Sequence, residues 1–230
     1  MEKIIFHKET KTFHLYNEEI SYIMCVLENG HMGQLYYGKR IHDKPDFSYL
    51  VEKCGRPMTS YIFEGDRSFS LEHIRQEYPV YGTTDYRHPA IEIMQENGSN
   101  ISEFKYVGYE ILKGKPSLKG LPATYTESEE EAETLKIILK DNLTGAKLTL
   151  LYTIFSKGSA IARSAHICNE GEKVLHLQTM MSLNLDLPDK DYVWMQLSGA
   201  WSKKEHWNRE SQQLTAGAEI LLMNTIHLWY

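Results

Sequence analysis

The chain has 230 residues, of which 42% are hydrophobic, so it is long enough to bury a sizeable core in one or two domains. With 31 acidic and 25 basic residues its net charge is -6, which lacks the basic excess that binding to nucleic acid or to an anionic membrane needs. Three widely spaced cysteines (Cys25, Cys54 and Cys168), a charged start and no apolar run near the ~18 residues of a membrane span predict a cytoplasmic protein.

Residue patterns in the first part of the chain predict β-strands. β-branched and aromatic residues cluster at 12–16 and 20–27 around the polar turn Asn17-Glu18, which is typical of a hairpin. A third strand is expected at 34–37. The segment 42–65 has mixed charge and no period.

Residues 66–90 are the longest stretch that we expect to be ordered loop. The stretch combines aromatics, prolines and paired charges without the period of a helix or strand, apart from a short helix expected around 71–76. Pro79 and Pro89 remove backbone donors, so side chains must hold the segment in place. Loops held by a rigid scaffold often carry function, and the plainer alternative is an aromatic-packed cover over a sheet.

The second half of the chain predicts further strands. Residues 90–95 alternate and end at Asn97-Gly98, a hairpin signal that we expect to lead into a strand of the same sheet at 104–112. Residues 114–123 hold two prolines and two glycines and indicate a connection, and the glutamates of 127–133 suit a solvated face with a short helix. Further strands are expected at 135–139, 147–155, 160–168 and 174–187, with hairpin turns at 142–145, 157–159 and 169–171. This spacing predicts an all-β fold, a large antiparallel sandwich with a few short helices.

Catalytic and metal-binding motifs are missing from the sequence. It holds no His-Glu-x-x-His, Gly-x-Ser-x-Gly or Cys-x-x-Cys, so we predict no metal and no cofactor. The histidines His14, His166 and His176 are expected to be packed or exposed rather than ligands. Aromatic faces beside charged groups suit sugar rings and equally suit a protein interface. The aromatic and charged residues concerned are Tyr78, Tyr81, Tyr86, Arg87, Trp194, Trp201 and Trp207.

A series of short motifs runs through the chain: DRSFSL at 66–71, QEYP at 76–79, DYR at 85–87, GKP at 114–116, GLPATY at 120–125, EAETL at 131–135, RSA at 163–165 and SGAW at 198–201. Over roughly residues 10–220 their order resembles the N-terminal domain of the α-galactosidases of glycoside hydrolase family 36. The resemblance implies a β-supersandwich domain of the galactose mutarotase-like type at residues 1–220. It also implies a catalytic (β/α)8 barrel and a small C-terminal β domain after it.

The resemblance implies retaining hydrolysis of terminal α-galactosides such as melibiose, raffinose and stachyose. In that chemistry one carboxylate attacks the anomeric carbon and a second protonates the leaving oxygen. The family's two catalytic aspartates lie in the barrel, one in a Lys-Trp-Asp motif that this sequence does not contain. We therefore expect no catalytic residue here and no hydrolysis by this chain alone. Residues 221–230 (LLMNTIHLWY) depart from the family pattern, and we expect a shifted or truncated reading frame.

Three positions are singled out by the resemblance as substrate contacts. Trp201 matches a tryptophan that lines the sugar pocket, and Arg67 matches an arginine near it. Gly55 stands where some members have an acidic residue, with Glu52 as a nearby substitute. The alternatives are a packed sandwich aromatic for Trp201 and a loop-fixing ion pair for Arg67.

The resemblance also implies a homo-oligomer, because family members assemble through this region. The prediction is therefore a domain that supplies one wall of an α-galactoside pocket together with subunit contacts. A stand-alone carbohydrate-binding or oligomerisation module is the alternative. We expect no useful sugar binding by such a module, since half of the pocket is absent and few contacts rarely offset the cost of association.

Overall fold

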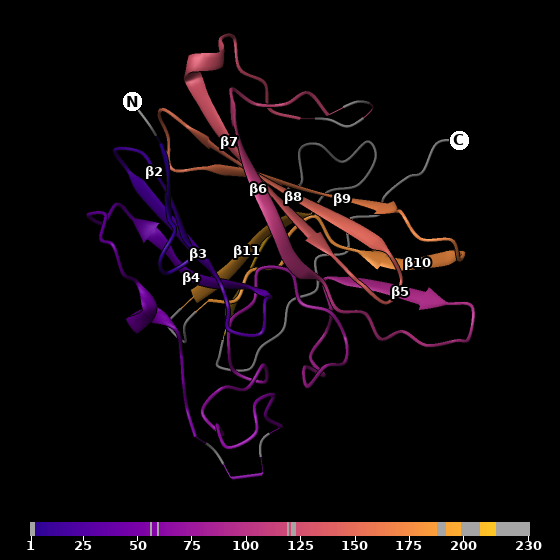
Figure 1. Ribbon diagram of the computed structural model, residues 1–230. Helices are drawn as coiled ribbons and strands as arrows, with labels where there is room; N and C mark the ends of the chain where they lie inside the picture. Colours follow the sequence, from indigo (N-terminus) through magenta and orange to yellow (C-terminus); the bar gives the residue numbers. More distant parts are fainter. Residues whose placement is uncertain are drawn as a thin grey trace. The chain divides into compact units, whose positions relative to one another are not determined.

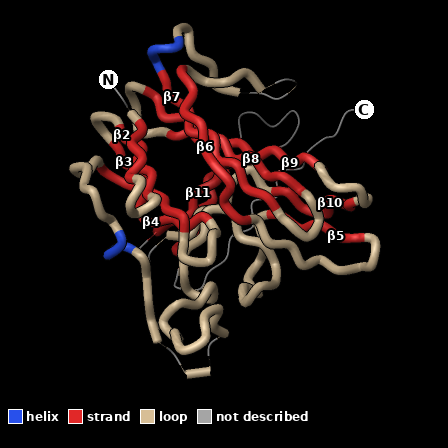
Figure 2. The backbone as a smooth tube through the Cα atoms, in the orientation of Figure 1, coloured by secondary structure: helices blue, strands red, loops and turns tan. Residues whose placement is uncertain are grey.

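The computed structural model describes residues 3–55, 57–58, 60–118, 120, 123–187, 192–198 and 208–214. The chain divides into two compact units, Met1–Asp186 and Leu187–Tyr230. Within the described ranges the regular structure is nearly all strand, with two short 3₁₀ helices, η1 (Ser48–Leu50) and η2 (Glu129–Glu131) (Figure 2). The predicted all-β class with a few short helices is confirmed. No helix in these ranges is both long enough and apolar enough to cross a bilayer.

Four antiparallel strands in chain order form the N-terminal sheet: β1 (Ile4–His7), β2 (Thr12–Tyr16), β3 (Ile20–Val26) and β4 (Met32–Lys39). The predicted hairpin between β2 and β3 is confirmed. At its turn the Asn17 side-chain oxygen accepts hydrogen bonds from the backbone N–H groups of Glu19 (2.8 Å) and Ile20 (2.9 Å). β3 is buried almost throughout, which requires cover on both faces of this sheet.

The central sheet consists of β6 (Lys105–Lys113), β7 (Ala132–Lys140), β8 (Ala146–Phe155) and β9 (Ile161–Asn169), again antiparallel neighbours in chain order. Buried and partly exposed residues alternate along β7 and β8, so one face of the sheet packs into a core. The hairpin turns predicted at 142–145 and 157–159 join β7 to β8 and β8 to β9. Figure 1 shows the central sheet beside the N-terminal sheet.

β5 (Ile91–Gln95) and β10 (Leu175–Met180) pair with each other in a separate antiparallel ribbon. The Asn97-Gly98 turn forms, with the Gly98 N–H donating to the Gln95 carbonyl at 2.9 Å. The expectation that it continues one sheet is nevertheless wrong, because β6 pairs with β7. The turn at 169–171 likewise joins strands of different sheets. Local turn chemistry sets the reversal, whereas burial of Ile91 and Ile93 in the core selects the partner strand.

Two other predicted elements differ from the structure. The strand expected at 174–187 ends at Met180, since the Met181 N–H donates to the Ala90 carbonyl (2.8 Å) and its carbonyl accepts from the Tyr78 hydroxyl. The helix expected around 71–76 is a series of turns. Its backbone bonds instead to the edge of β4, where the Gln34 N–H donates to the Arg75 carbonyl at 3.1 Å.

Two apolar clusters flank the N-terminal sheet. The larger one lies between this sheet and the central sheet and includes Phe13, Leu15, Leu135, Leu148 and Leu150. The smaller one lies on the opposite face, where Phe47, Phe69, Leu71 and Ile74 cover Ile23, Cys25 and Leu35 of the strands. The segment 41–74 is therefore a packed cover on the outer face of this sheet. Its purple section around residues 52–68 extends beyond the strands in Figure 1.

The second unit is described by a single antiparallel pair, β11 (Tyr192–Ser198) and β12 (Asn208–Leu214), in register from Tyr192 opposite Leu214 to Ser198 opposite Asn208. The sequence patterns did not predict either strand. Trp201 and the divergent residues 221–230 lie outside the described residues. A domain boundary at residue 220 stays a prediction.

Candidate functional site

Gly55 and Arg67 lie on neighbouring backbone segments of the cover. The Cys54 N–H donates to the Ser68 carbonyl at 3.2 Å, and the two predicted site residues flank this bond. A turn just before Arg67 is closed by the Asp66 N–H and the Phe63 carbonyl (3.2 Å), with Gly65 at a φ of 84°. Hydrogen bonds from the Ser68 hydroxyl (2.6 Å) and N–H (2.8 Å) to the Asp66 carboxylate lower the pKa of that carboxyl. We call residues 52–68 the Arg67 loop.

The Arg67 loop has an anchored base. Phe69, directly after it, is 1% exposed, and its ring centroid lies 5.2 Å from that of Phe63. The Lys53 ammonium group lies 2.5 Å from a Glu28 carboxylate oxygen and 6.0 Å from the centre of the Phe69 ring. Packing and an ion pair thus fix the base of the loop, next to Arg67, and a rigid support of this kind is what a binding residue needs.

Arg67 is exposed, and it forms no ion pair or hydrogen bond with the residues that the structure describes. The alternative of a loop-fixing ion pair therefore finds no partner within the described ranges. Within the described ranges, none of the five guanidinium N–H donors is taken up by another residue. Gly55 is also exposed, and no described atom lies within 4 Å of the place where a Cβ would stand. An acidic side chain would fit at that position.

A buried charged network fixes residues 66–90, which we call the organising loop. Glu77 accepts hydrogen bonds from the hydroxyls of Tyr22 (2.6 Å) and Tyr152 (2.7 Å), and its carboxylate lies 3.2 Å from the Arg163 guanidinium. Burial, reinforced by the charge of Glu77, raises the pKa of Tyr22 well above its ordinary value. The network joins β3, β8 and β9 to residue 77, and with Glu77 1% exposed it has no access for a substrate. Its role is to hold the loop, and no motif search of the sequence would find it.

A second buried cluster holds a serine, a histidine and an aspartate in the order of a hydrolytic triad. His14 Nδ1 lies 2.7 Å from Asp43 Oδ1, and His14 Nε2 lies 2.9 Å from the Ser21 hydroxyl. His14 and Ser21 are both 0% exposed, so the hydroxyl cannot reach a substrate. His7 also contacts the same Asp43 oxygen (2.9 Å), which ties the segment after β4 to β1 and β2. The prediction that His14 is packed is correct, and His166 and His176 are exposed.

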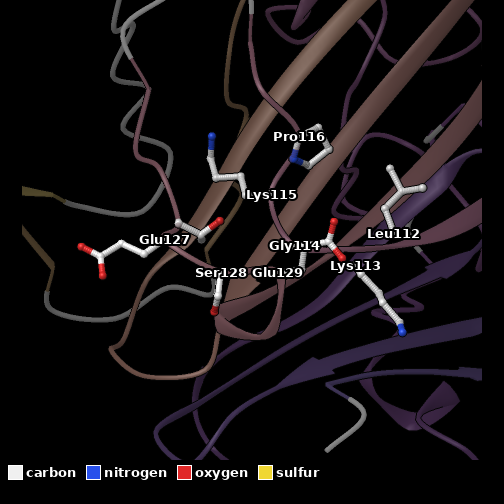
Figure 3. Close-up of a pocket in the computed structure, with 9 residues that line it drawn as sticks. Leu112, Lys113, Gly114, Lys115, Pro116, Glu127, Ser128 and Glu129 are labelled. Carbon is white, nitrogen blue, oxygen red and sulfur yellow. The ribbon is translucent and has the colours of Figure 1, made fainter.

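An open groove of about 580 Å³ lies where β6 ends. It is lined by Leu112, Lys113, Gly114, Lys115, Pro116, Thr126, Glu127, Ser128 and Glu129. Figure 3 shows that Lys113, Lys115 and Glu127 point in different directions and do not converge on one point. The groove thus has charges of both signs but no assembled site. No three His, Cys, Asp or Glu side chains in the described part of the chain form a metal site.

The aromatic residues of the organising loop divide into two groups. Tyr78 is 6% exposed and belongs to the core, and Arg87 bonds to Asp85 and to backbone carbonyls. Tyr81 and Tyr86 are 42% and 63% exposed. Only the latter pair keeps the surface position that sugar contact requires.

Comparisons with known proteins bear on this arrangement. The sequence profile described as the glycosyl hydrolase family 36 N-terminal domain matches residues 30–221. The chain belongs to this family. The α-galactosidase AgaA of Geobacillus stearothermophilus is 40% identical over 216 residues, which are 94% of this chain and 29% of that protein. This chain is thus similar to the N-terminal part of a longer α-galactosidase.

Solved structures of family 36 enzymes agree with the fold. The α-galactosidase of Lactobacillus brevis has a TM-score of 0.85 at 37% identity, covering 91% of this chain and 28% of its own. A variant of AgaA in complex with raffinose has a TM-score of 0.82 at 40% identity, covering 89% of this chain and 28% of its own. The chain therefore spans less than a third of the length of these relatives, and its β-supersandwich fold is confirmed.

Proposed function

We propose that this chain acts as the N-terminal domain of a family 36 α-galactosidase and supplies one wall of its galactoside pocket through Arg67 and the backbone at Gly55. The observation that carries the proposal is the Arg67 loop, an anchored loop whose exposed guanidinium has no partner among the described residues, in a chain that matches this family's N-terminal domain. A guanidinium is suited to this role because its planar fork of donors bonds hydroxyl and carboxylate oxygens in fixed directions. Trp201 would add a stacking surface.

The substrate class is α-galactosides such as raffinose, stachyose and melibiose. Support comes from the AgaA complex with raffinose, which is a complex of a relative. Hydrolysis itself needs two carboxylates about 5 Å apart across the glycosidic bond. We assign that pair to a catalytic barrel and expect this chain by itself to leave α-galactosides intact.

Subunit contact is the second proposed role. The Arg67 loop extends beyond the sheets (Figure 1), and this exposure supports a contact with another subunit. The three cysteines, each unpaired, favour a reducing compartment such as the cytoplasm.

A chimera tests the first role. This chain replaces the matched N-terminal part of the Geobacillus stearothermophilus enzyme, and hydrolysis of 4-nitrophenyl α-galactoside is followed beside the isolated chain. We expect turnover by the chimera and none by the chain alone. A chimera that folds as judged by circular dichroism and yet lacks activity would contradict the proposal, and so would turnover by the purified chain that survives contaminant controls.

The oligomer role is tested separately by light scattering of the folded chimera. We expect an assembly larger than one chain. A strict monomer at micromolar concentration would remove the subunit-contact role and leave the pocket role standing.

A further inference from the structure

A second exposed aromatic feature lies outside the Arg67 loop. Residues 81–86, which we call the tyrosine hairpin, fold back over a two-residue turn. The Gly82 N–H donates to the Asp85 carbonyl at 2.9 Å, and the Asp85 N–H donates to the Gly82 carbonyl at 3.1 Å. Tyr81 and Tyr86 stand on either side of this turn.

The turn has an unfavourable local conformation. Its central residues Thr83 and Thr84 have φ angles of 52° and 77°, a region that glycine and asparagine adopt readily and β-branched residues rarely do. The hydroxyls of both threonines are buried and have no hydrogen-bond partner in the described structure. The surroundings must therefore impose the turn, and backbone strain of this kind is concentrated at ligand-binding and active sites.

A buried carboxylate holds the base of the hairpin. Asp85 is 1% exposed and accepts hydrogen bonds from Gln76 Nε2 at 2.6 Å and from Arg87 Nε and Nη2, each at 3.0 Å. Arg87 Nη2 also donates to the Leu71 carbonyl at 2.9 Å. On the other side, Ile101 packs against Gly82, where a Cβ would meet its side chain at 3.3 Å. The two tyrosine rings are thus presented on a fixed frame.

The rings form a right-angled surface. Their centroids lie 5.8 Å apart with an interplanar angle of 73°, and neither phenol hydroxyl bonds to a residue in the described ranges. A pyranose has a C–H face that packs on an aromatic ring and hydroxyls that bond to a free phenol. Tyr81, Tyr86 and Ile101 are 42%, 63% and 50% exposed. These few side chains are enough to contact one sugar ring, whereas a stable protein interface takes ~800 Å² from each partner, so we assign this surface to a sugar.

We propose that the tyrosine hairpin is an accessory pyranose-binding site for the α-galactoside substrate class. The ligand class rests on the proposed function, whereas the residues are separate from Arg67, Gly55 and Trp201. Two rings on an open surface give weak binding, with a dissociation constant on the order of 10 mM. Such a site would hold the substrate near the domain without taking part in the reaction.

Nuclear magnetic resonance of the intact chain with ¹³C-labelled tyrosine rings tests the site, with raffinose as the probe and glycerol as an acyclic polyol control. We expect saturable shifts of the Tyr81 and Tyr86 resonances with raffinose and none with glycerol. Tyr81→Ala and Tyr86→Ala should each abolish the shift of the remaining ring. Tyr125→Ala, which removes a tyrosine that is 83% exposed elsewhere, should leave both shifts unchanged.

The paired replacement of Thr83→Asn and Thr84→Gly keeps the hairpin with residues that favour its turn, and it should retain the raffinose shifts. Arg67→Ala should also leave them unchanged, so failure of the Arg67 pocket and failure of the tyrosine hairpin are distinguishable. Absence of saturation up to raffinose concentrations ~20 times the expected dissociation constant would overturn the proposal. Line broadening that grows with protein concentration and ignores raffinose would assign the surface to a protein contact instead, and would also overturn it.

Discussion

Replacing Glu77 by glutamine tests whether the buried network holds the organising loop to the two sheets. The substitution keeps the shape of the side chain and removes its negative charge. One tyrosine hydroxyl keeps an acceptor, but the Arg163 guanidinium, now 3.2 Å from a neutral group, loses its counter-charge. The Glu77 side chain is 0% exposed and that of Arg163 10% exposed, so water does not replace the lost charge.

The expected loss follows from that burial. Removing one partner of a buried ion pair destabilises a protein by about 3–5 kcal/mol, because the other charge is left uncompensated. A urea dependence of about 2–3 kcal/mol per molar then lowers the unfolding midpoint by about 1–2 M.

Urea unfolding followed by intrinsic fluorescence measures this change. The matched control is Glu110→Gln, which removes a similar pair in which Glu110 lies 2.9 Å from Lys136 but is 53% exposed. Exposed pairs contribute about 0–1 kcal/mol, so the control should barely move the midpoint. Equal, small losses in both variants would show that the Glu77 network is not the buried pair described above.

Three further predictions concern the cover, a turn and the pocket. Burial lowers the pKa of His14. The pKa of Asp43 is also lowered, because the hydrogen bonds from His14 and His7 outweigh the opposite effect of burial. Both groups bind fewer protons in the folded than in the unfolded protein, so acidification should lower the free energy of unfolding. The first fall should begin as the pH drops through about 6.5, the pKa of His14 in the unfolded chain, and a further fall from Asp43 should follow below about pH 4. His14→Gln should flatten the first fall in urea midpoints measured against pH, and stability that rises on acidification through this range would refute the assignment. Gly145→Ala should destabilise the β7–β8 hairpin more than Gly158→Ala does, since both have positive φ but only at Gly145 would the Cβ meet backbone, at 2.7 Å from Gly171 Cα; equal melting temperatures would contradict the steric argument. Gly55→Asp in the chimera should lower KM for raffinose by a few-fold, consistent with a hydrogen bond of about 1 kcal/mol, and an unchanged KM would remove Gly55 from the pocket.

Strand positions were predictable where burial has a simple period. The hairpin at Asn17 and the alternating strands β7 and β8 have one face in the core, so their patterns indicate both the element and its partner. Pairing across the chain was not predictable. Ile91 and Ile93 signal a strand, but nothing near them in sequence indicates that β10, some 80 residues later, is the neighbour. The helix expected at 71–76 failed for the same reason, because the edge of β4 offers its backbone a partner.

The candidate site was predictable only through the resemblance. Nothing in the composition distinguishes Arg67 from the other arginines, and its exposure emerges from the turn at Gly65 and the anchor at Phe69. The tyrosines show the limit of composition most clearly. Tyr78 and Tyr81 are three residues apart in one motif-rich loop, yet one lies in the core and the other at the surface. Trp201 as a pocket residue stays a prediction.

The most direct test of the pocket role is the kinetics of Arg67→Ala in the chimera, with raffinose as substrate. Arg40→Ala serves as the control, since Arg40 is an exposed arginine that stacks on Tyr16, with its guanidinium 4.9 Å from the ring centre. Loss of a charged hydrogen bond of about 1.5–3 kcal/mol should lower kcat/KM by roughly tenfold or more in the Arg67 variant and leave the Arg40 variant unchanged. Identical kcat/KM values for the two variants and the parent chimera would contradict the claim that this domain forms part of the sugar pocket.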